Sequence, residues 1–354
     1  MASVAGSQRR AETQLIEAAR AGDDEAFGRL TQTYFRELHV HCYRMLGSFH
    51  DAEDLVQETF LRAWRSLSTY EARAPFRSWL YRIATNVCLR EIERRPSRTL
   101  PQDFSPAADP MRPLSPPITE IVLLEPYPNH LLGELAGRAP DLEATYLFRE
   151  SIELAFLAVV QLLPPRQRAV LLLHDVLGWR AAEVAGLLGS SPAAVSSALQ
   201  RARATLAYHH RDAGSFPHRD AASEATVRSV VTRYITAWEK GDMNVLAALL
   251  KEDAVLTMAP APNWFRGRTA IAIFFDQLCF SEHPKRFRLL SSGANGQPAC
   301  AAYELDRGAA AFRFSGIMAL RLEGDQVAEI TGFGDPGLFA VFGLPEVLKD
   351  EVSD

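Results

Sequence analysis

The sequence predicts a multidomain protein in which two all-α domains are followed by an α+β domain. Residues 12–96 carry apolar residues at helical spacing, with few glycines and prolines to break the pattern. A proline-rich segment follows at 97–140, where prolines disfavour regular helix and central strand. Helical spacing resumes over 141–212, and residues 224–346 combine helices with the alternation that is typical of strands.

The composition indicates a soluble globular protein. Its 354 residues exceed one ordinary domain, and 47% hydrophobic with 23% charged residues is a globular average. The net charge of -5 excludes a protein that coats nucleic acid with its whole surface, so a nucleic-acid site has to be a local patch. No apolar stretch is long enough to span a bilayer, and four separated cysteines fit reduced thiols, so we expect a cytoplasmic protein without cofactor or metal. A metal site at His39, His41 and Cys42 is the weaker alternative to an ordinary amphipathic helix.

Residues 51–67 are expected to form an amphipathic helix with a charged second face. The predicted core face consists of Leu55, Phe60, Ala63, Trp64 and Leu67. The second face carries Asp54, Glu58 and Arg62 at i, i+4 and i+8. Spacing alone favours a solvated face whose charges pair with one another.

The region from Arg62 to Arg98 is locally basic, with nine arginines against three acidic residues. Aromatic residues are interleaved with the arginines, which is the pattern that single-stranded nucleic acid requires for base stacking and phosphate pairing. Phe76 and Trp79 share one helical stripe with other apolar residues, so we interpret them as core. The candidate nucleic-acid contacts are therefore Arg73, Arg77, Arg82, Asn86 and Arg90, with the loop from 66 to 75 as a place for an unstacked base.

Residues 163–207 have the pattern of a helix-turn-helix. A first helix over 180–188 is followed by Gly189 for a left-handed turn, by Ser190 or Ser191 as a cap, and by Pro192 in the next first turn. In the second helix the inward residues are Val195, Leu199, Ala202 and Leu206. The candidate contacts to duplex DNA are Arg180, Ser196, Ser197, Gln200, Arg201 and Arg203. A plain three-helix bundle is the alternative interpretation.

A second polar linker at 213–223 precedes the α+β domain. Its first helix carries an apolar stripe from Val227 to Trp238, and Asp242 is expected to cap the next helix after Gly241. The aromatic residues that we expect to build its core or a pocket wall are Trp238, Trp264, Phe265, Phe274 and Phe314.

Three segments in this order resemble regions two and four of an extracytoplasmic-function (ECF) sigma factor of the sigma-70 family: residues 51–67, 74–94 and 163–206. The final segment resembles the SnoaL-type, NTF2-like domain of one subset of these factors, in WFRGRTAI and AEITGFGDPGLFAVFGLP among others. The resemblance implies a region-two domain at 12–96, a region-four domain at 141–212 and a cone-shaped NTF2-like domain at 224–346. Residues 123–132, LLEPYPNHLL, resemble a WLEPYPD-like linker signature, with Leu123 and Asn129 where tryptophan and aspartate are usual.

The resemblance also implies roles for the candidate residues. The helix 51–67 would dock on the clamp helices of the polymerase β′ subunit through Asp54, Gln57, Glu58 and Arg62. The segment matching 70–90 would melt the minus-10 element and capture a flipped base. The helix 192–206 would read the minus-35 element beside a contact with the β flap.

We therefore predict an alternative sigma factor without covalent chemistry. Its C-terminal domain is expected to be a regulator that responds to a small-molecule or protein effector, because an apolar cone joined to a transcription factor fits a sensor. One alternative is a one-component helix-turn-helix regulator with a ligand-binding domain, which the basic, aromatic patch disfavours. The other is an NTF2-like isomerase or hydrolase with helical appendages. For that alternative the resemblance makes Asp253, His283 and Asp335 the acid-base residues to consider, but a capping or turn role is the commoner explanation for Asp253.

Overall fold

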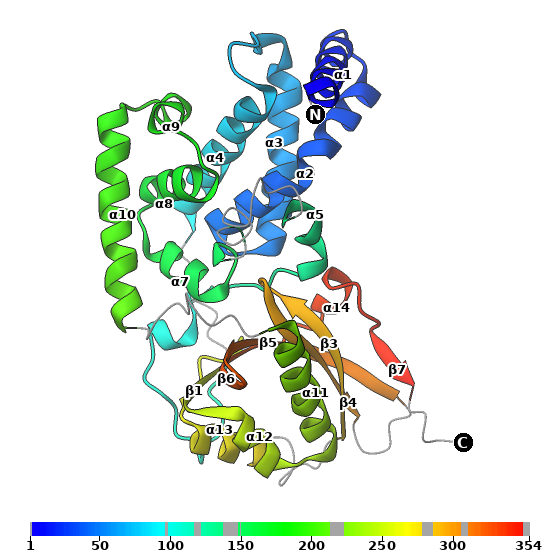
Figure 1. The fold of residues 1–354 in the computed structure, drawn as a ribbon, viewed down its shortest axis with the longest axis vertical. Coiled ribbons are helices and arrows are strands. Elements are labelled where there is room, and N and C mark those ends of the chain that lie inside the picture. Colours follow the sequence, from blue (N-terminus) through cyan, green and yellow to red (C-terminus); the bar gives the residue numbers. More distant parts are fainter. Residues whose placement is uncertain are drawn as a thin grey trace. The chain divides into compact units, whose positions relative to one another are not determined.

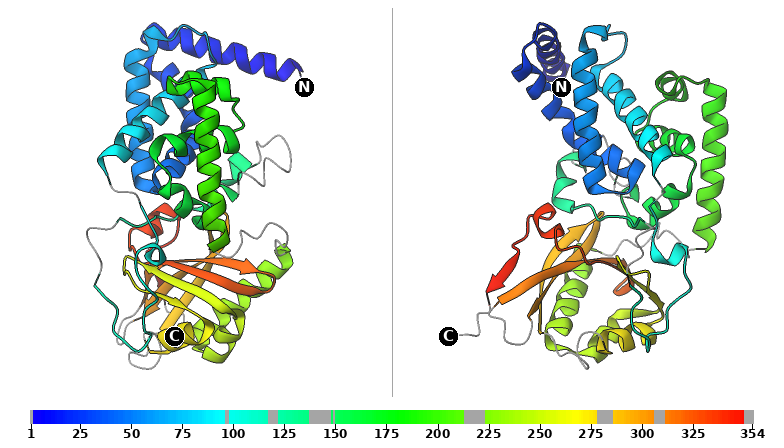
Figure 2. Two further views of the ribbon diagram at one scale, coloured as in Figure 1. Left: turned by 90° about the vertical axis from the view of Figure 1, so that its left-hand side faces the viewer. Right: turned by 180° about the vertical axis from the view of Figure 1, so that it is seen from behind.

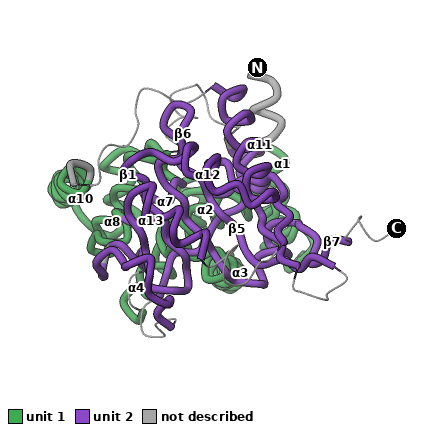
Figure 3. The backbone as a smooth tube through the Cα atoms, turned by 90° about the horizontal axis from the view of Figure 1, so that it is seen from below, with its two compact units in different colours: residues 1–97, 138–151, 159–212 green, residues 98–137, 152–158, 213–354 purple. Residues whose placement is uncertain are grey.

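The computed structural model describes residues 2–95, 98–116, 122–136, 148, 150–212, 223–277, 286–305 and 311–349. The chain divides into two compact units (Figure 3). The first comprises residues 1–97, 138–151 and 159–212, and the second comprises 98–137, 152–158 and 213–354. The first unit is all-α and the second is α+β, which confirms the predicted fold class. Within the described residues, no helix is both long and apolar enough to cross a bilayer.

Four helices build the N-terminal part of the first unit (Figure 1): α1 (Ala2–Arg20), α2 (Asp24–Leu46), α3 (Phe49–Ser66) and α4 (Phe76–Arg94). α2 is the central helix, since it contacts the other three and its residues 38–46 are all buried. Asp23 begins it by accepting a hydrogen bond from the Ala26 amide (2.9 Å), and Gly47 ends it in the left-handed conformation with φ 73°. Local capping chemistry therefore fixes where the chain turns.

The buried face of α3 differs from the predicted one. Of the predicted residues Ala63 and Leu67 are buried, whereas Leu55, Phe60 and Trp64 are only half-buried. The other buried positions of the face are Ala52, Val56 and Thr59. The small side chains allow α2 and α3 to approach closely, while the large rings flank the contact. The Trp64 ring lies 4.9 Å from that of Phe27 on α2. The size of the side chains therefore decides which face of α3 is buried, and the spacing of apolar residues alone does not reveal this.

The rest of the first unit contains the predicted helix-turn-helix. It comprises α8 (Pro165–Leu171), the π-helical turn η4 (Leu172–Val176), α9 (Ala181–Leu188) and α10 (Pro192–Asp212), reached through α7 (Leu154–Leu162). Gly189 adopts φ 60°, and the Ser191 hydroxyl accepts from the Ala194 amide at 3.2 Å, as the turn chemistry predicts. α4 packs against α8 and α9, so the two helical regions, which the sequence analysis describes as separate domains, belong to one compact unit.

The second unit is a curved sheet (Figure 2). α11 (Glu224–Lys240), α12 (Met243–Leu249) and α13 (Arg268–Phe275) pack on one face of the sheet, and the short α14 (Leu338–Val341) packs on the other. Its strands are β1 (Leu250–Ala259), β2 (Trp264–Arg266), β3 (Arg286–Ala294), β4 (Gln297–Leu305), β5 (Ala311–Glu323), β6 (Gln326–Phe333) and β7 (Val347–Lys349). In the described residues the order is β2-β1-β6-β5-β4-β3, with β7 paired to β5 and only the β1–β6 pair parallel. The Asp242 carboxylate accepts from the Val245 amide at 3.1 Å, so the predicted cap of α12 is present.

The proline-rich segment belongs to the second unit and is not a separate linker there. Its regular structure is limited, in the residues described, to η2 (Pro101–Asp103), η3 (Asn129–Leu131), α5 (Gly133–Ala136) and two isolated bridges, Thr99 with Leu123 and Pro128 with Ala294. The Trp264 indole donates to the Ser105 carbonyl (2.7 Å), and the Ala108 amide donates to the Trp264 carbonyl (2.8 Å). Regular structure in this segment is thus short, but the segment still packs on the rest of the unit through these hydrogen bonds.

The hairpin between β3 and β4 binds the end of the proline-rich segment through four hydrogen bonds, an arrangement called the clamp below. The buried Asn295, at φ 54°, accepts from the Tyr127 amide (2.9 Å) and donates its own amide to the Tyr127 carbonyl (2.7 Å). The Asn129 side chain accepts from the Gly296 amide (2.7 Å) and donates to the Gln297 carbonyl (2.9 Å). An aspartate could make only the first of these two bonds, because a carboxylate only accepts. The departure at Asn129 from the linker signature therefore suits this clamp.

Candidate nucleic-acid and polymerase interface

The outer face of α3 combines charges with an exposed apolar side chain. Asp54 and Gln57 are exposed, and Glu58 pairs with Arg62 at 2.6 Å. Leu61 lies beside them and is 51% exposed. The self-pairing that the spacing predicted is present for Glu58 and Arg62, but Leu61 was missed. Polar groups around an exposed leucine form a composition suited to protein docking.

The outer face of α4 carries a basic stripe. Arg82, Asn86 and Arg90 are exposed, and their i, i+4, i+8 spacing places them on one line along the helix. Arg77, expected to belong to this set, instead forms an ion pair with Glu37 of α2 at 2.8 Å and lies over the Tyr81 ring. The ion pair joins a side chain of α4 to one of α2, so Arg77 stabilises the packing of these two helices.

The loop before α4 is open to solvent and rests on an aromatic cluster. Residues 71–75 are all exposed, and Arg73 pairs there with Glu71 at 2.6 Å. Tyr70 and Phe76 are buried and in ring contact, which confirms that Phe76 is core. The loop is therefore exposed to solvent, while buried aromatic residues hold both of its ends.

The second helix of the helix-turn-helix presents its polar face outward. Val195, Leu199 and Ala202 are buried, while the exposed residues include Ser196, Ser197, Gln200, Arg201 and Arg203, as the spacing predicted. Arg180 is also exposed and pairs with Glu183 at 3.1 Å. Arg203 is bound to Asp175 of η4 at 2.6 Å, so it also ties α10 to the preceding turn.

Replacing Asp175 by asparagine is expected to lower the free energy of unfolding by about 1 kcal/mol or less at neutral pH. Burial raises the pKa of Asp175, but hydrogen bonds from Arg203 and His174 outweigh it and lower the pKa below its usual value. The stabilisation is therefore present above the unfolded-state pKa of about 3.9 and lost as pH falls through the lowered folded-state value. Urea unfolding of both proteins from neutral to acidic pH measures this; a difference that persists in acid would contradict the assignment.

The two helical regions are joined through a buried arginine that the sequence analysis missed. Arg168 of α8 donates to the Met45 carbonyl of α2 (2.5 Å), to the Gln161 side chain (2.6 Å) and to the Gln161 carbonyl (2.7 Å). It is 1% exposed, and this burial lowers the pKa of Arg168 to about 10. The guanidinium remains charged at neutral pH and cross-links α2, α7 and α8.

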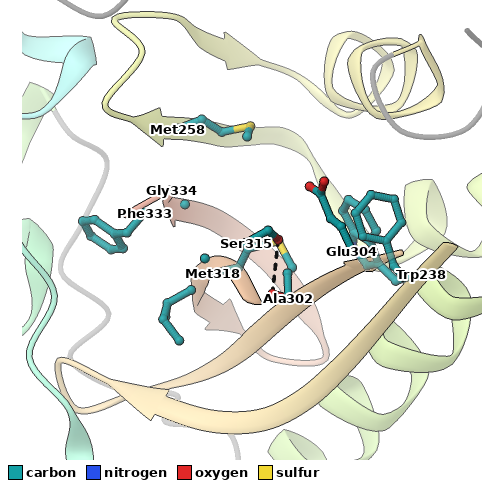
Figure 4. Close-up of a pocket in the computed structure, with 12 residues that line it drawn as sticks. Trp238, Met258, Ala302, Glu304, Ser315, Met318, Phe333 and Gly334 are labelled. Carbon is teal, nitrogen blue, oxygen red and sulfur yellow. Dashed lines mark hydrogen bonds between the residues drawn. The ribbon is translucent and has the colours of Figure 1, made fainter. Parts of the chain in front are cut away.

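The second unit contains an inner cavity of about 170 Å³ between the sheet and α11 (Figure 4). Its walls include Trp238, Met258, Phe287, Glu304, Met318 and Phe333. Of the five aromatic residues expected to build core or pocket wall, Trp238 lines it; Trp264, Phe265, Phe274 and Phe314 do not. Phe265 and Phe274 stack on each other in the core at 4.3 Å, and Phe314 packs against Tyr303.

The catalytic candidates of this unit that the structure describes do not form an acid-base site. Asp253 is 78% exposed and near Lys251, and Asp335 is exposed and accepts from the Gly337 amide at 2.8 Å. His283 lies outside the described residues. Asp253 and Asp335 thus occupy surface and turn positions, which do not supply the burial that tunes a catalytic carboxyl.

Comparison with known proteins identifies the family to which this combination of helical regions and an α+β domain belongs. Family models match "Sigma-70 region 2" at residues 30–98, "Sigma-70, region 4" at 153–206 and "SnoaL-like domain" at 231–330. The chain is 42% identical over 330 residues to the ECF RNA polymerase sigma factor SigG of Mycobacterium tuberculosis, covering 93% of this chain and 86% of that protein. The chain belongs to the ECF RNA polymerase sigma factors.

The chain is also similar to a second sigma factor in sequence and to a third in structure. It is 39% identical over 80 residues to the ECF sigma factor SigW of Bacillus subtilis, which covers 23% of this chain and 43% of that protein. The crystal structure of the Mycobacterium tuberculosis sigma factor SigJ matches with a TM-score of 0.55 at 22% identity, covering 88% of this chain and 97% of that chain. The SigJ likeness shows that the two proteins share a fold. The sigma factor thus consists of regions two and four followed by a SnoaL-like domain, as predicted.

Proposed function

We propose that this sigma factor binds core RNA polymerase, directs it to promoters with particular minus-35 and minus-10 elements and helps to open the DNA. The observation that carries the proposal is the presence, in one unit, of the exposed α4 stripe at Arg82, Asn86 and Arg90 and the outward polar face of α10. The α4 stripe suits single-stranded DNA and the α10 face suits the major groove. A one-component regulator would use α10 alone and leave the α4 stripe without a role.

The outer face of α3 is the proposed polymerase contact, through Asp54, Gln57, Glu58, Arg62 and the adjacent Leu61. The α4 stripe with Arg73 is the proposed minus-10 surface, and α10 with Arg180 is the proposed minus-35 surface. We assign Arg77 and Arg203 structural roles first, because their guanidinium groups are bound to Glu37 and Asp175. The minus-35 helix begins with alanines, so its recognition is expected to depend on shape and phosphates as well as on Gln200 and Arg201.

The C-terminal domain is proposed to regulate these steps without covalent chemistry of its own. Its cavity is apolar in large part, whereas Asp253 and Asp335 lie at the surface. The proline-rich segment between the two sigma regions is bound to this domain through Asn295 and Asn129. A change in the domain can therefore reach the chain that connects regions two and four.

Run-off transcription with purified bacterial core polymerase, the full-length protein and a pool of genomic promoters tests the proposal. Promoter-specific transcripts that depend on the protein are expected. Binding of duplex DNA by the protein alone, without any transcript from core polymerase, would support the one-component regulator instead.

Changing Asp54 to arginine is expected to weaken binding to core polymerase by at least about tenfold, since it reverses an exposed charge on the docking face. Glu17→Arg is the matched control, because it makes the same charge change on an exposed position of α1. Fluorescence anisotropy of the labelled proteins with core polymerase measures both affinities. Equal affinities for the two variants would remove α3 from the polymerase contact.

A further inference from the structure

Helix α1 lies outside the residues that match the region 2 model, yet its last residue is bound to the α3–α4 loop, residues 67–75. The Arg20 guanidinium donates to the backbone carbonyls of Leu67 (3.3 Å), Ser68 (3.3 Å) and Tyr70. We propose that Arg20 is a positioning residue for promoter opening, which holds the α3–α4 loop in the shape that receives an unstacked base of the minus-10 strand. The inference rests on the proposed function, in which α4 and this loop form the minus-10 surface.

The carbonyl groups that Arg20 binds belong to the chain just past the end of α3. α3 ends at Ser66, and one 3-10 turn, η1 (Leu67–Thr69), follows it. The last carbonyls of a helix carry a partial negative charge, and a guanidinium presents several N–H donors in a fixed fork. Arg20 therefore caps α3 from a different helix, as basic side chains do at helix ends.

The rest of the loop has a defined shape although it is exposed. The hydroxyl of the buried Tyr70 donates to the Ala74 carbonyl at 2.8 Å and so closes the exposed residues 71–75 into a turn. Ala72 in this turn adopts φ 55°, a left-handed conformation that costs free energy for a residue with a side chain. A strained backbone of this kind persists only where the surrounding structure holds it. The hydrogen bonds from Arg20 to the start of the loop provide such support.

A loop of fixed shape lowers the cost of capturing a base. Taking a base out of its stack already costs free energy. A loop that has its final shape before DNA arrives adds no further entropy cost of ordering, whereas a mobile loop would have to be ordered by the DNA. Arg20 is therefore expected to raise the affinity for the opened strand through the loop, while its own donors stay on the loop carbonyls.

Binding of polymerase, assembled with the full-length protein, to promoter forks tests this role. Arg20→Met should weaken binding to a fork with an intact single-stranded minus-10 element by about tenfold. The minus-10 nucleotides are then made abasic one at a time. At the position whose base the loop receives, the two proteins should bind the abasic fork within about twofold of each other. A general loss of stability would instead lower the affinities for intact and abasic forks alike.

Two further variants and the salt dependence separate positioning from direct contact with DNA. Arg10→Met is the matched control and should leave fork binding unchanged, because Arg10 is an exposed arginine of the same helix. Arg20→Lys keeps the charge but offers one nitrogen in place of the fork, so it should recover only part of the loss. The slope of log affinity against log salt should be equal for Arg20→Met and the unchanged protein, since a guanidinium bound to carbonyls neutralises no phosphate.

Hydrogen exchange of the free proteins reports on the loop itself. Amides of residues 68–74 should exchange about tenfold faster in Arg20→Met than in the unchanged protein and in Arg10→Met. The inference is overturned if exchange there is unaffected, if no abasic position removes the difference in binding, or if the salt slope becomes shallower in Arg20→Met. A shallower slope would make Arg20 a phosphate contact.

The same measurements distinguish failure of this inference from failure of the proposed function. If the unchanged protein binds core polymerase but gives it no affinity for the fork, the sigma function is refuted and the role of Arg20 with it. If the unchanged protein gives base-dependent fork binding and Arg20→Met weakens intact and abasic forks equally, only the role of Arg20 is refuted.

Discussion

Replacing Arg168 by methionine is expected to lower the free energy of opening of the first unit by about 3 kcal/mol. The buried guanidinium donates to carbonyl oxygens of Met45 and Gln161 and to the Gln161 side chain. Methionine fills similar space but donates nothing, so these acceptors would be left buried without their donor. The cost is largest where α8 meets α2, because the Arg168 guanidinium on α8 is bound to the Met45 carbonyl of α2.

Native-state hydrogen exchange measures this effect locally. Amides of residues 38–46 and 159–172 should exchange about a hundredfold faster in Arg168→Met if they open with the unit. Arg166→Met is the matched control, since Arg166 lies on the same helix and is exposed. If both variants exchange at the rate of the unchanged protein, the packing of α8 on α2 does not depend on Arg168.

Arg168 also illustrates which parts of the fold the sequence could reveal. Features set by neighbouring residues were predicted correctly: the turn at Gly189 with its Ser191 cap, and the Asp242 cap after Gly241. Arg168 lies in a stretch whose pattern predicts a helix but says nothing of a partner 123 residues earlier. The docking of the proline-rich segment was equally hidden, because Tyr127 meets Asn295 168 positions later.

In the candidate site, too, the residues set by local spacing could be predicted, whereas those set by long-range packing could not. The outward residues of α4 and α10 could be predicted because helical spacing separates a buried face from an exposed one. The partner of Arg77 could not be predicted, since its pairing with Glu37 depends on how α4 crosses α2; its side chain is half-exposed. The cavity walls were mostly missed: strand register decides that Met318 and Glu304 line the inner cavity while Phe314 does not.

Reversing two charges of the α4 stripe, in Arg82→Glu with Arg90→Glu, is expected to weaken binding of polymerase to a promoter fork by about a hundredfold or more. Both side chains are exposed on one line of the helix, whereas Arg77 is held by the Glu37 carboxylate. Removing one arginine that neutralises a phosphate also makes the slope of log affinity against log salt shallower by about 0.7 for single-stranded DNA. The double variant should therefore show both a lower affinity and a shallower salt dependence.

Filter binding of the assembled polymerase to a fork with a single-stranded minus-10 element, over a series of salt concentrations, measures both quantities. Arg29→Glu is the control with one charge reversal, because Arg29 is exposed on α2, away from the stripe. Asn86→Ala carries no charge change, so its effect on affinity should differ between minus-10 sequences and leave the salt slope unchanged. If Arg29→Glu lowers affinity per charge as much as the double variant, DNA responds to net charge and α4 does not form the minus-10 surface. If the slope stays constant while affinity falls, Arg82 and Arg90 contact bases or polymerase and not phosphates.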